Sequence, residues 1–155
     1  MVSIAQLQEI PPENMILLVG PPGSGKSTFC YQAVLNSIQV RPVIYVTTES
    51  SPIKVEESLR KNGLGEVSPH PLGFVDAFHD TVGIPRKAHP DTVNATCEDL
   101  TSLSIAIAKL KEKIQEKALL VFDSLTSPYV FNGQGILRFM RQTISGFAAE
   151  GNAVL

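Results

Sequence analysis

Short apolar runs alternate along the chain with longer stretches whose apolar residues recur at helical spacing. The runs at residues 15–19, 43–48, 72–78 and 118–123 predict strands, and "NAVL" at residues 152–155 begins a fifth. Strands that are buried on both faces of a parallel sheet read as near-continuous apolar runs, because helices cover both faces. The alternation therefore predicts an α/β fold, a three-layer sandwich built around a mostly parallel sheet.

Helices are expected in the intervals between these strands. Ser51 and Pro52 form a typical helix start, and Gly63 is a typical stop. No clear period runs through residues 79–97, which we expect to form an irregular loop. The apolar positions that predict the other helices are Phe29, Cys30, Ala33, Val34 and Ile38; Leu103, Ile107, Leu110 and Ile114; and Ile136, Phe139, Met140, Ile144 and Phe147.

The composition is that of one globular domain. Of the 155 residues, 43% are hydrophobic and 18% are charged, so we expect one domain with a sizeable core over residues 1–155. Because the fifth run begins only where the sequence stops, we expect this domain to be incomplete at its C-terminus. The net charge of −2 gives no overall attraction to nucleic acid or to an anionic membrane.

The cysteines and the N-terminal stretch indicate the compartment. Cys30 and Cys97 are far apart and lack metal-ligand spacing, so we expect reduced, buried thiols. Residues 1–20 lack the basic and apolar regions of a leader, and no apolar run approaches the roughly 20 residues that span a bilayer. These features predict a cytoplasmic protein without a membrane partner.

The segment GPPGSGKS, residues 20–27, matches the phosphate-binding pattern G-x-x-x-x-G-K-[ST] between a predicted strand and a predicted helix. Gly23 and Gly25 allow backbone conformations in which successive N–H groups point inward around an anion. Lys26 supplies a charge for the β- and γ-phosphates, and the Ser27 hydroxyl can ligate Mg²⁺. A glycine-rich turn that binds nothing is the alternative, and the flanking elements disfavour it. The predicted nucleotide-contacting residues are Gly20, Pro21, Pro22, Gly23, Ser24, Gly25, Lys26, Ser27 and Thr28.

Two acids stand at the ends of predicted strands, where open α/β sheets bind their ligands. Asp123 can hold Mg²⁺ through water; an ordinary strand-end cap is the alternative, which the phosphate-binding motif upstream disfavours. Glu49 is the candidate to orient or deprotonate an attacking water, with Lys26 as the second catalytic residue. From the residues alone, a solvated acid near a helix N-terminus explains Glu49 about equally well.

Four segments in this order and spacing resemble the RecA-type ATPases, most closely the KaiC-like branch: GPPGSGKST, VIYVTTESSP, FVDAF and LLVFDSLTSP. The resemblance implies a RecA-like P-loop NTPase core with strand order 5-1-4-3-2, counting the five predicted runs along the chain. In that order the strand of Asp123 lies next to the strand before the glycine loop. The resemblance also implies that Glu49 is the catalytic glutamate and Asp123 the metal-binding aspartate, with ATP and Mg²⁺ as ligands.

The chain departs from the family pattern in two places. KaiC proteins carry paired glutamates where this chain has Glu49 and Ser50, so hydrolysis is expected to be slow or differently tuned. The family also continues past the fifth strand with segments that carry subunit contacts and, in the recombinases, DNA-binding loops. We therefore do not expect nucleic acid as a partner of this piece. For the complete protein the resemblance implies a homo-oligomer, a hexamer, or a protein partner.

Other polar residues carry less information about function. His70, His79 and His89 are irregularly spaced, and we expect them at the surface rather than around a metal. Arg138 and Arg141 are expected on the solvated face of an amphipathic helix.

The residues together favour a Mg²⁺-dependent ATPase with a regulatory or signalling role, in which the nucleotide state controls assembly or partner binding. A nucleotide-binding regulatory module with little turnover is a second interpretation, which Ser50 and the expected truncation favour. A P-loop kinase acting on a small acceptor is a third. It is disfavoured because the arginines are dispersed along the chain rather than gathered in a lid over the transferred phosphoryl group.

Overall fold

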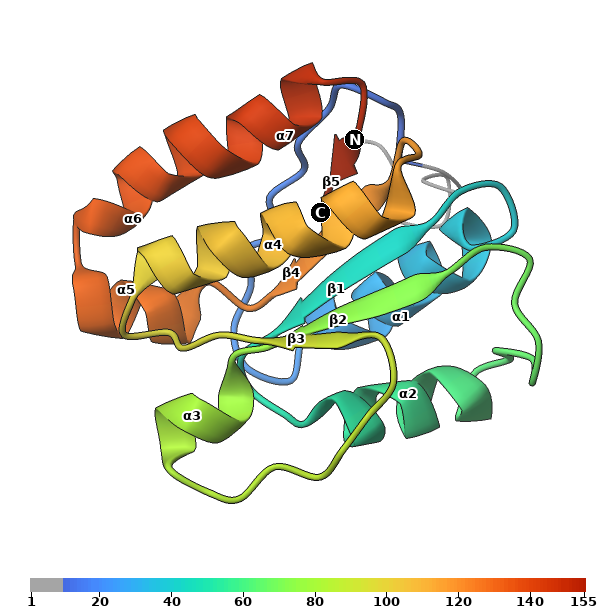
Figure 1. Cartoon of the computed structure of the whole chain (residues 1–155), viewed down its shortest axis with the longest axis horizontal. Helices are drawn as coiled ribbons and strands as arrows, with labels where there is room; N and C mark the ends of the chain where they lie inside the picture. Colours follow the sequence, from blue (N-terminus) through green and yellow to red (C-terminus); the bar gives the residue numbers. More distant parts are fainter. Residues whose placement is uncertain (1–9) are drawn as a thin grey trace.

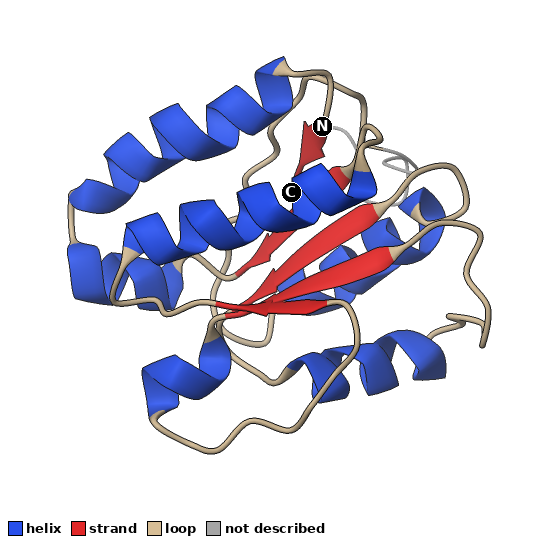
Figure 2. Ribbon diagram, viewed as in Figure 1, coloured by secondary structure: helices blue, strands red, loops and turns tan. Residues whose placement is uncertain are grey.

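The structure of the protein is a computed structural model that describes residues 10–155 (Figure 1). The first nine residues, which belong to the stretch without a leader pattern, lie outside the described residues. Within residues 10–155, a five-stranded, all-parallel sheet forms the middle layer and helices cover both of its faces (Figure 2). The predicted α/β class and the three-layer arrangement are confirmed.

Four of the five predicted runs, at residues 43–48, 72–78, 118–123 and 152–155, form slightly shorter strands. The strands are β1 (Val43–Thr47), β2 (Leu72–Asp76), β3 (Thr92–Asn94), β4 (Leu119–Asp123) and β5 (Ala153–Val154). The helices are α1 (Lys26–Ser37), α2 (Pro52–Lys61), α3 (Phe78–Val82), α4 (Leu100–Ile114), α5 (Thr126–Asn132), α6 (Gly135–Phe139) and α7 (Ser145–Ala149). A π-helical stretch, η2 (Met140–Ile144), joins α6 to α7 into the last predicted helix. The elements β3, α3 and α5 were not predicted.

Local capping signals set the ends of two helices. The Ser51 hydroxyl accepts a hydrogen bond from the Lys54 N–H at 3.4 Å, and Pro52 occupies the first turn of α2. Gly63 follows α2 with a φ of +118°. The predicted start and stop of this helix are therefore confirmed. At the start of α4, the Asp99 carboxylate accepts a hydrogen bond from a backbone N–H at 2.8 Å.

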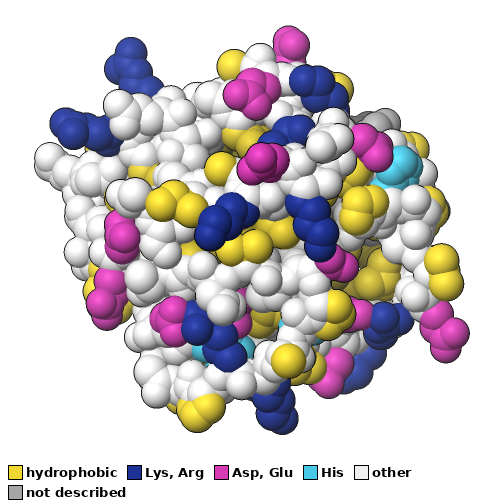
Figure 3. Space-filling view, viewed as in Figure 1, with side chains coloured by type: hydrophobic (Ala, Val, Ile, Leu, Met, Phe, Trp, Pro, Cys, Tyr) yellow, Lys and Arg dark blue, Asp and Glu magenta, His cyan; other side chains and the backbone are white. Residues whose placement is uncertain are grey.

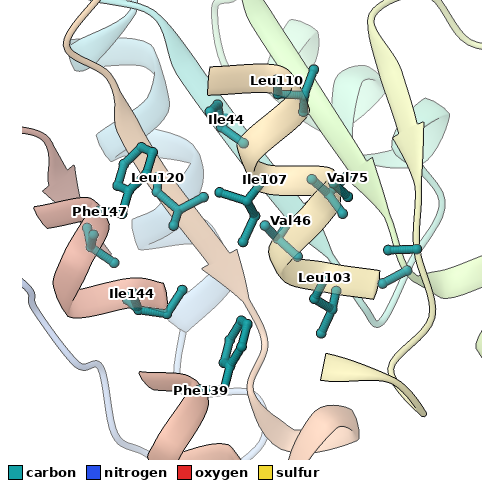
Figure 4. Packing of buried hydrophobic residues seen from close by; sticks show 14 of the residues in the cluster. Ile44, Val46, Val75, Leu103, Ile107, Leu110, Leu120, Phe139, Ile144 and Phe147 are labelled. Carbon is teal, nitrogen blue, oxygen red and sulfur yellow. The ribbon is translucent and has the colours of Figure 1, made fainter. Parts of the chain in front are cut away.

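Alternate residues of each strand pack into two apolar cores, one on each face of the sheet. Ile44 and Val46 point toward α4, whose Ile107 lies against them (Figure 4). Val43 and Tyr45 point to the other face, where α1 and α2 cover them. All five residues of β1 are buried. Burial on both faces explains why this strand lacks polar alternation in the sequence.

The order of the strands across the sheet differs from the order that the resemblance implies. The observed order is β3-β2-β1-β4-β5. β1 rather than β2 lies beside β4, and β5 rather than the segment before the glycine loop is the other neighbour of β4. Strands buried on both faces look alike in sequence, so hydrophobicity alone carries no information about their lateral order.

The predicted strand at residues 15–19 is wrong. Within the described part of the chain it forms one bridge to Val154, next to which the Ile16 N–H donates to the Val154 carbonyl oxygen at 2.9 Å. Leu17 and Val19 are 64% and 87% exposed. Within residues 10–155, the later residues of this apolar run pair with no strand.

Residues 79–97 do not form one irregular loop, because they contain most of α3 and all of β3. The Asp76 carboxylate accepts hydrogen bonds from the N–H groups of Phe78 and His79, both at 3.2 Å, and so starts α3. β3 pairs in parallel with the edge of β2. Elements of five and three residues are too short to show a period in the sequence.

The surface is mixed in charge on the face that Figure 3 shows. Basic and acidic side chains are interspersed over it rather than gathered by sign. None of the helices within residues 10–155 has the length and apolar character that crossing a membrane requires.

The α4 core contact predicts a difference between two isoleucines of that helix. Ile107 is 2% exposed, and Ile107→Ala should lower the free energy of unfolding by about 2–5 kcal/mol, since a cavity forms in the core. Ile105 is 50% exposed, and Ile105→Ala should change it by only about 0.5 kcal/mol. Urea unfolding measures both. Equal losses would contradict the assignment of the buried face.

Candidate functional site

The glycine loop leads directly into α1. Gly23 and Gly25 have φ angles of +77° and +86°, and a Cβ built on either would meet no atom within 4 Å. Glycine is therefore needed there for backbone conformation and not for space. Lys26 is the first residue of α1, so the loop amides adjoin the positive end of a helix dipole. Such an arrangement suits an anion.

The Lys26 ammonium group lies over this loop. Its Nζ donates hydrogen bonds to the carbonyl oxygens of Gly20 at 2.7 Å and Pro21 at 2.9 Å. The charged end of the side chain is thus held at the loop rather than extended into solvent. Phosphate oxygens are stronger acceptors of an ammonium proton than these neutral carbonyls, so the group is placed to exchange them for an anion.

Ser27 and Asp123 are far apart in the sequence but come together in the fold. The Ser27 hydroxyl donates to Asp123 Oδ1 at 3.4 Å, and the Tyr45 hydroxyl donates to Asp123 Oδ2 at 2.7 Å. Hydroxyl and carboxylate oxygens are ligands that Mg²⁺ prefers, and the ion keeps several of its waters. Ser27 and Asp123 therefore fit a magnesium ion held by one or two protein oxygens.

Tyr45 is a fixed donor to Asp123. Its side chain is fully buried in the sheet, on the face covered by α1. Burial, together with the nearby Asp123 charge, raises the pKa of the Tyr45 hydroxyl well above its ordinary value. The hydroxyl therefore stays protonated and donates to the carboxylate at any physiological pH.

Glu49 follows β1 and is surrounded by hydroxyl groups. Its Oε1 accepts a hydrogen bond from Ser127 at 2.8 Å and from Ser124 at 3.3 Å, and the Thr48 hydroxyl oxygen lies 3.5 Å away. The carboxylate itself is exposed to solvent. A solvated acid with one oxygen fixed by donors has its second oxygen available to accept a proton from water.

Three hydrogen bonds of Thr48, here called the Thr48 clamp, join the end of β1, which precedes Glu49, to the end of β4, which carries Asp123. The Thr48 N–H donates to the Asp123 carbonyl oxygen at 3.0 Å. The Thr48 hydroxyl donates to the Ser124 carbonyl oxygen and accepts from the Ser124 N–H, both at 2.8 Å. Glu49 and Asp123 therefore leave the sheet from neighbouring, tightly joined strand ends.

A cavity of about 270 Å³ opens beside this polar cluster. Asp123 and Lys26 lie at its wall, but most of its lining is apolar and includes Ile16, Leu18 and Met140. Phosphate groups need N–H donors and cations rather than apolar walls. The exposed glycine loop, and not the cavity, is accordingly the candidate phosphate site.

The sequence-predicted residues gather in two contacts at the carboxyl edge of the sheet. Asp123 meets Ser27 of the glycine loop, and Glu49 meets Ser124, the residue after Asp123. The structure adds four residues that the sequence analysis missed: Tyr45, Thr48, Ser124 and Ser127. Tyr45 looked like one more apolar strand residue. The sequence did contain a signal for the others, because hydroxyl residues stand next to both acids: Thr48 precedes Glu49, and Ser124 follows Asp123.

Two of the three histidines, His79 and His89, differ from the expectation that they lie at the surface. His79 is buried, with Nδ1 2.6 Å from Asp76 Oδ2, because the acid that starts α3 also binds the ring. His89 Nε2 lies 2.5 Å from Glu56 Oε2 and ties the loop after α3 to α2. Arg138 and Arg141 are exposed, as predicted.

The family is shown by comparison with known proteins. A family model described as the KaiC ATPase matches residues 4–151 of the chain. The chain belongs to the KaiC ATPase family. KaiC-like proteins are RecA-like P-loop NTPases, and membership places this chain among the ATP-binding NTPases.

Archaeal and bacterial relatives share the same region. A UPF0273 protein of Pyrococcus furiosus is 33% identical over 127 residues, covering 78% of this chain and 50% of the relative. A UPF0273 protein of Pyrococcus horikoshii is 31% identical over 128 residues, with the same coverage of both chains. A UPF0273 protein of Thermotoga maritima is 30% identical over 146 residues, covering 88% of this chain and 59% of the relative. The chain thus spans about half the length of the curated relatives it matches.

The cysteines are free and buried, as predicted, and this sets their reactivity. Burial raises the pKa of the Cys30 thiol to about 12, and the nearby Asp123 charge contributes to the same shift. Burial also raises the pKa of the Cys97 thiol. Since only the thiolate reacts, iodoacetamide at about pH 8 should label neither residue in the folded protein and both after unfolding. Mass spectrometry of the peptides distinguishes the two sites. Rapid labelling of Cys30 in the folded protein would contradict its burial.

Proposed function

We propose that this chain is a Mg²⁺-dependent ATPase in which Glu49 activates the water that attacks the γ-phosphate. The observation that carries the proposal is the pair of acids at adjoining strand ends, Glu49 after β1 and Asp123 at the end of β4, with Asp123 in contact with Ser27 of the glycine loop. Membership of an ATPase family supports ATP as the nucleotide.

Binding is assigned to the glycine loop and the residues that follow it. In this proposal the N–H groups of the loop and the start of α1 hold the α- and β-phosphates, and Lys26 exchanges its loop carbonyls for β- and γ-phosphate oxygens. Ser27 and Asp123 would hold the metal. When bound, Mg²⁺ neutralises negative charge on the β- and γ-phosphate oxygens.

Glu49 acts as the general base in the proposed step. Its carboxylate takes a proton from water while the water oxygen forms a bond to the γ-phosphorus. The bond from the γ-phosphorus to the bridging oxygen breaks, and the electron pair leaves with ADP. Lys26 offsets the negative charge on the transferred group, and the proton on Glu49 then passes to solvent.

We further propose that the nucleotide state controls assembly or partner binding in a cytoplasmic protein. Ser50 follows Glu49 where a second acid would otherwise stand, and its carbonyl oxygen accepts a hydrogen bond from the Thr47 hydroxyl at 2.6 Å. One general base without a second carboxylate is compatible with slow turnover, which suits a signalling role. A homo-oligomer of the complete protein is part of this proposal.

Glu49→Gln tests the base directly. We expect kcat to fall about a hundredfold or more while ATP affinity is retained, because the amide cannot take a proton. Phosphate release and equilibrium binding of a fluorescent ATP analogue measure the two quantities. Glu57→Gln, an exposed acid on α2, is the matched control and should leave both unchanged.

Equal turnover in wild type and Glu49→Gln would remove Glu49 from the mechanism. Tight ATP binding without phosphate release in the wild type would instead favour a regulatory module that does not turn over.

Tyr45→Phe tests the support of the proposed metal-binding carboxylate. Removing the hydroxyl leaves Asp123 Oδ2 without its donor at 2.7 Å, so the Mg²⁺ concentration for half-maximal hydrolysis should rise about tenfold. Tyr31→Phe is the control, because the Tyr31 ring stacks on Tyr45 at 6.3 Å but its hydroxyl does not bond Asp123. The same Mg²⁺ requirement in Tyr45→Phe as in wild type would show that this hydrogen bond does not orient Asp123.

A further inference from the structure

The closest donor to the Glu49 carboxylate is a hydroxyl at the start of α5, within the LLVFDSLTSP segment but not among the predicted site residues. Ser127 Oγ donates to Glu49 Oε1 at 2.8 Å, against 3.3 Å for Ser124 and 3.5 Å for Thr48. A hydroxyl has one proton to donate, and the Thr48 proton is already engaged with the Ser124 carbonyl oxygen at 2.8 Å. Ser127 is thus the donor that defines where Oε1 lies.

α5 is a firm support for this hydroxyl. Its Asn132 side chain donates to the Cys97 carbonyl oxygen at 2.7 Å and to the Pro128 carbonyl oxygen at 2.8 Å. Pro128, next to Ser127, is buried. Ser124 has a second task, since its hydroxyl also accepts the Thr126 N–H at 3.3 Å near the start of the helix. The hydrogen bond from Asn132 to Cys97 joins α5 to the segment before α4 independently of Glu49.

An exposed glutamate without such a contact samples many rotamers, and few of them present an oxygen to a given water. Fixing one oxygen through a short hydrogen bond on a rigid helix raises the fraction of time that the other oxygen is correctly oriented. The two hydroxyl oxygens of Ser127 and Ser124 converge on the same atom, Oε1. Oε2 is therefore the oxygen left for the water.

We propose that Ser127 is a positioning residue for Glu49: its hydroxyl holds Oε1 so that Oε2 accepts the proton of the attacking water. This inference rests on the proposed function, because it assumes that Glu49 is the general base. It assigns to the LTSP segment after Asp123 a role in orienting the base, in addition to its role as the start of a helix.

The test compares steady-state hydrolysis by the full chain and its variants. Ser127→Ala should lower kcat about tenfold, since orientation of the base is lost. The KM for ATP should stay within about twofold, because the hydrogen bond found for the Ser127 hydroxyl among residues 10–155 goes to Glu49 and not to the glycine loop or Asp123. Ser127→Thr keeps the hydroxyl and should restore most of the lost rate. Ser68→Ala is the matched control, since the Ser68 hydroxyl donates to the His70 carbonyl oxygen in the loop before β2.

A double-mutant cycle with Glu49→Gln separates the two proposals. If Ser127 acts through Glu49, the double variant should turn over as slowly as Glu49→Gln alone. A large effect of Glu49→Gln with wild-type kcat in Ser127→Ala would overturn the positioning role and leave the proposed function intact. Wild-type turnover in Glu49→Gln would overturn the proposed function.

Three further outcomes would overturn the role of Ser127. They are additive losses in the double variant, no recovery of rate in Ser127→Thr, and a kcat for Ser127→Ala above that of the wild type, which would mean that the hydrogen bond restrains Glu49. Absence of any hydrolysis by the wild type would overturn both proposals together.

Discussion

The parallel pairing of β1 with β4 is the interaction on which the site depends. Thr47 pairs with Asp123 in this register, and the Thr48 clamp continues the pairing past the end of β4. Successive side chains of a strand point to opposite faces, so a slip of one residue would turn Asp123 to the α4 face. Asp123 would then lose its hydrogen bonds with both Ser27 and Tyr45. The buried apolar residues of β1 and β4 hold this register, because shifting it would move them out of the two cores. The cores on the two faces of the sheet therefore determine the positions of Glu49 and Asp123.

Hydroxyl groups rather than cations hold both acids. Asp123 is bound by Ser27 and Tyr45, and Glu49 is bound most closely by Ser127. None of the ion pairs found among residues 10–155 includes either acid. Hydrogen bonds from neutral donors orient a carboxylate without neutralising its charge. Each acid is therefore oriented by neutral donors, without a cation paired to it among the described residues.

The sequence predicted those parts of the site whose requirements are local. Gly23 and Gly25 adopt backbone angles that other residues disfavour. The loop that they form can therefore be predicted from their spacing alone, without knowledge of the rest of the chain. Asp123 was readable because it ends a continuous apolar run. The contribution of Tyr45 depends on β1 lying beside β4, and that lateral order is not encoded in hydrophobicity. Ser127 was missed for a related reason, since its contact with Glu49 joins residues 78 positions apart.

The Tyr45 hydrogen bond also has an optical consequence. The chain contains no tryptophan and three tyrosines, so tyrosine dominates its ultraviolet emission. A phenol that donates to a carboxylate emits weakly, because its excited state shifts the proton toward the acceptor. We therefore expect weak emission from Tyr45, which donates to Asp123, and stronger emission from Tyr129, which is exposed on α5. A ligand that displaced the Tyr45 hydroxyl from Asp123 would therefore be expected to change the tyrosine fluorescence of the protein without an added label.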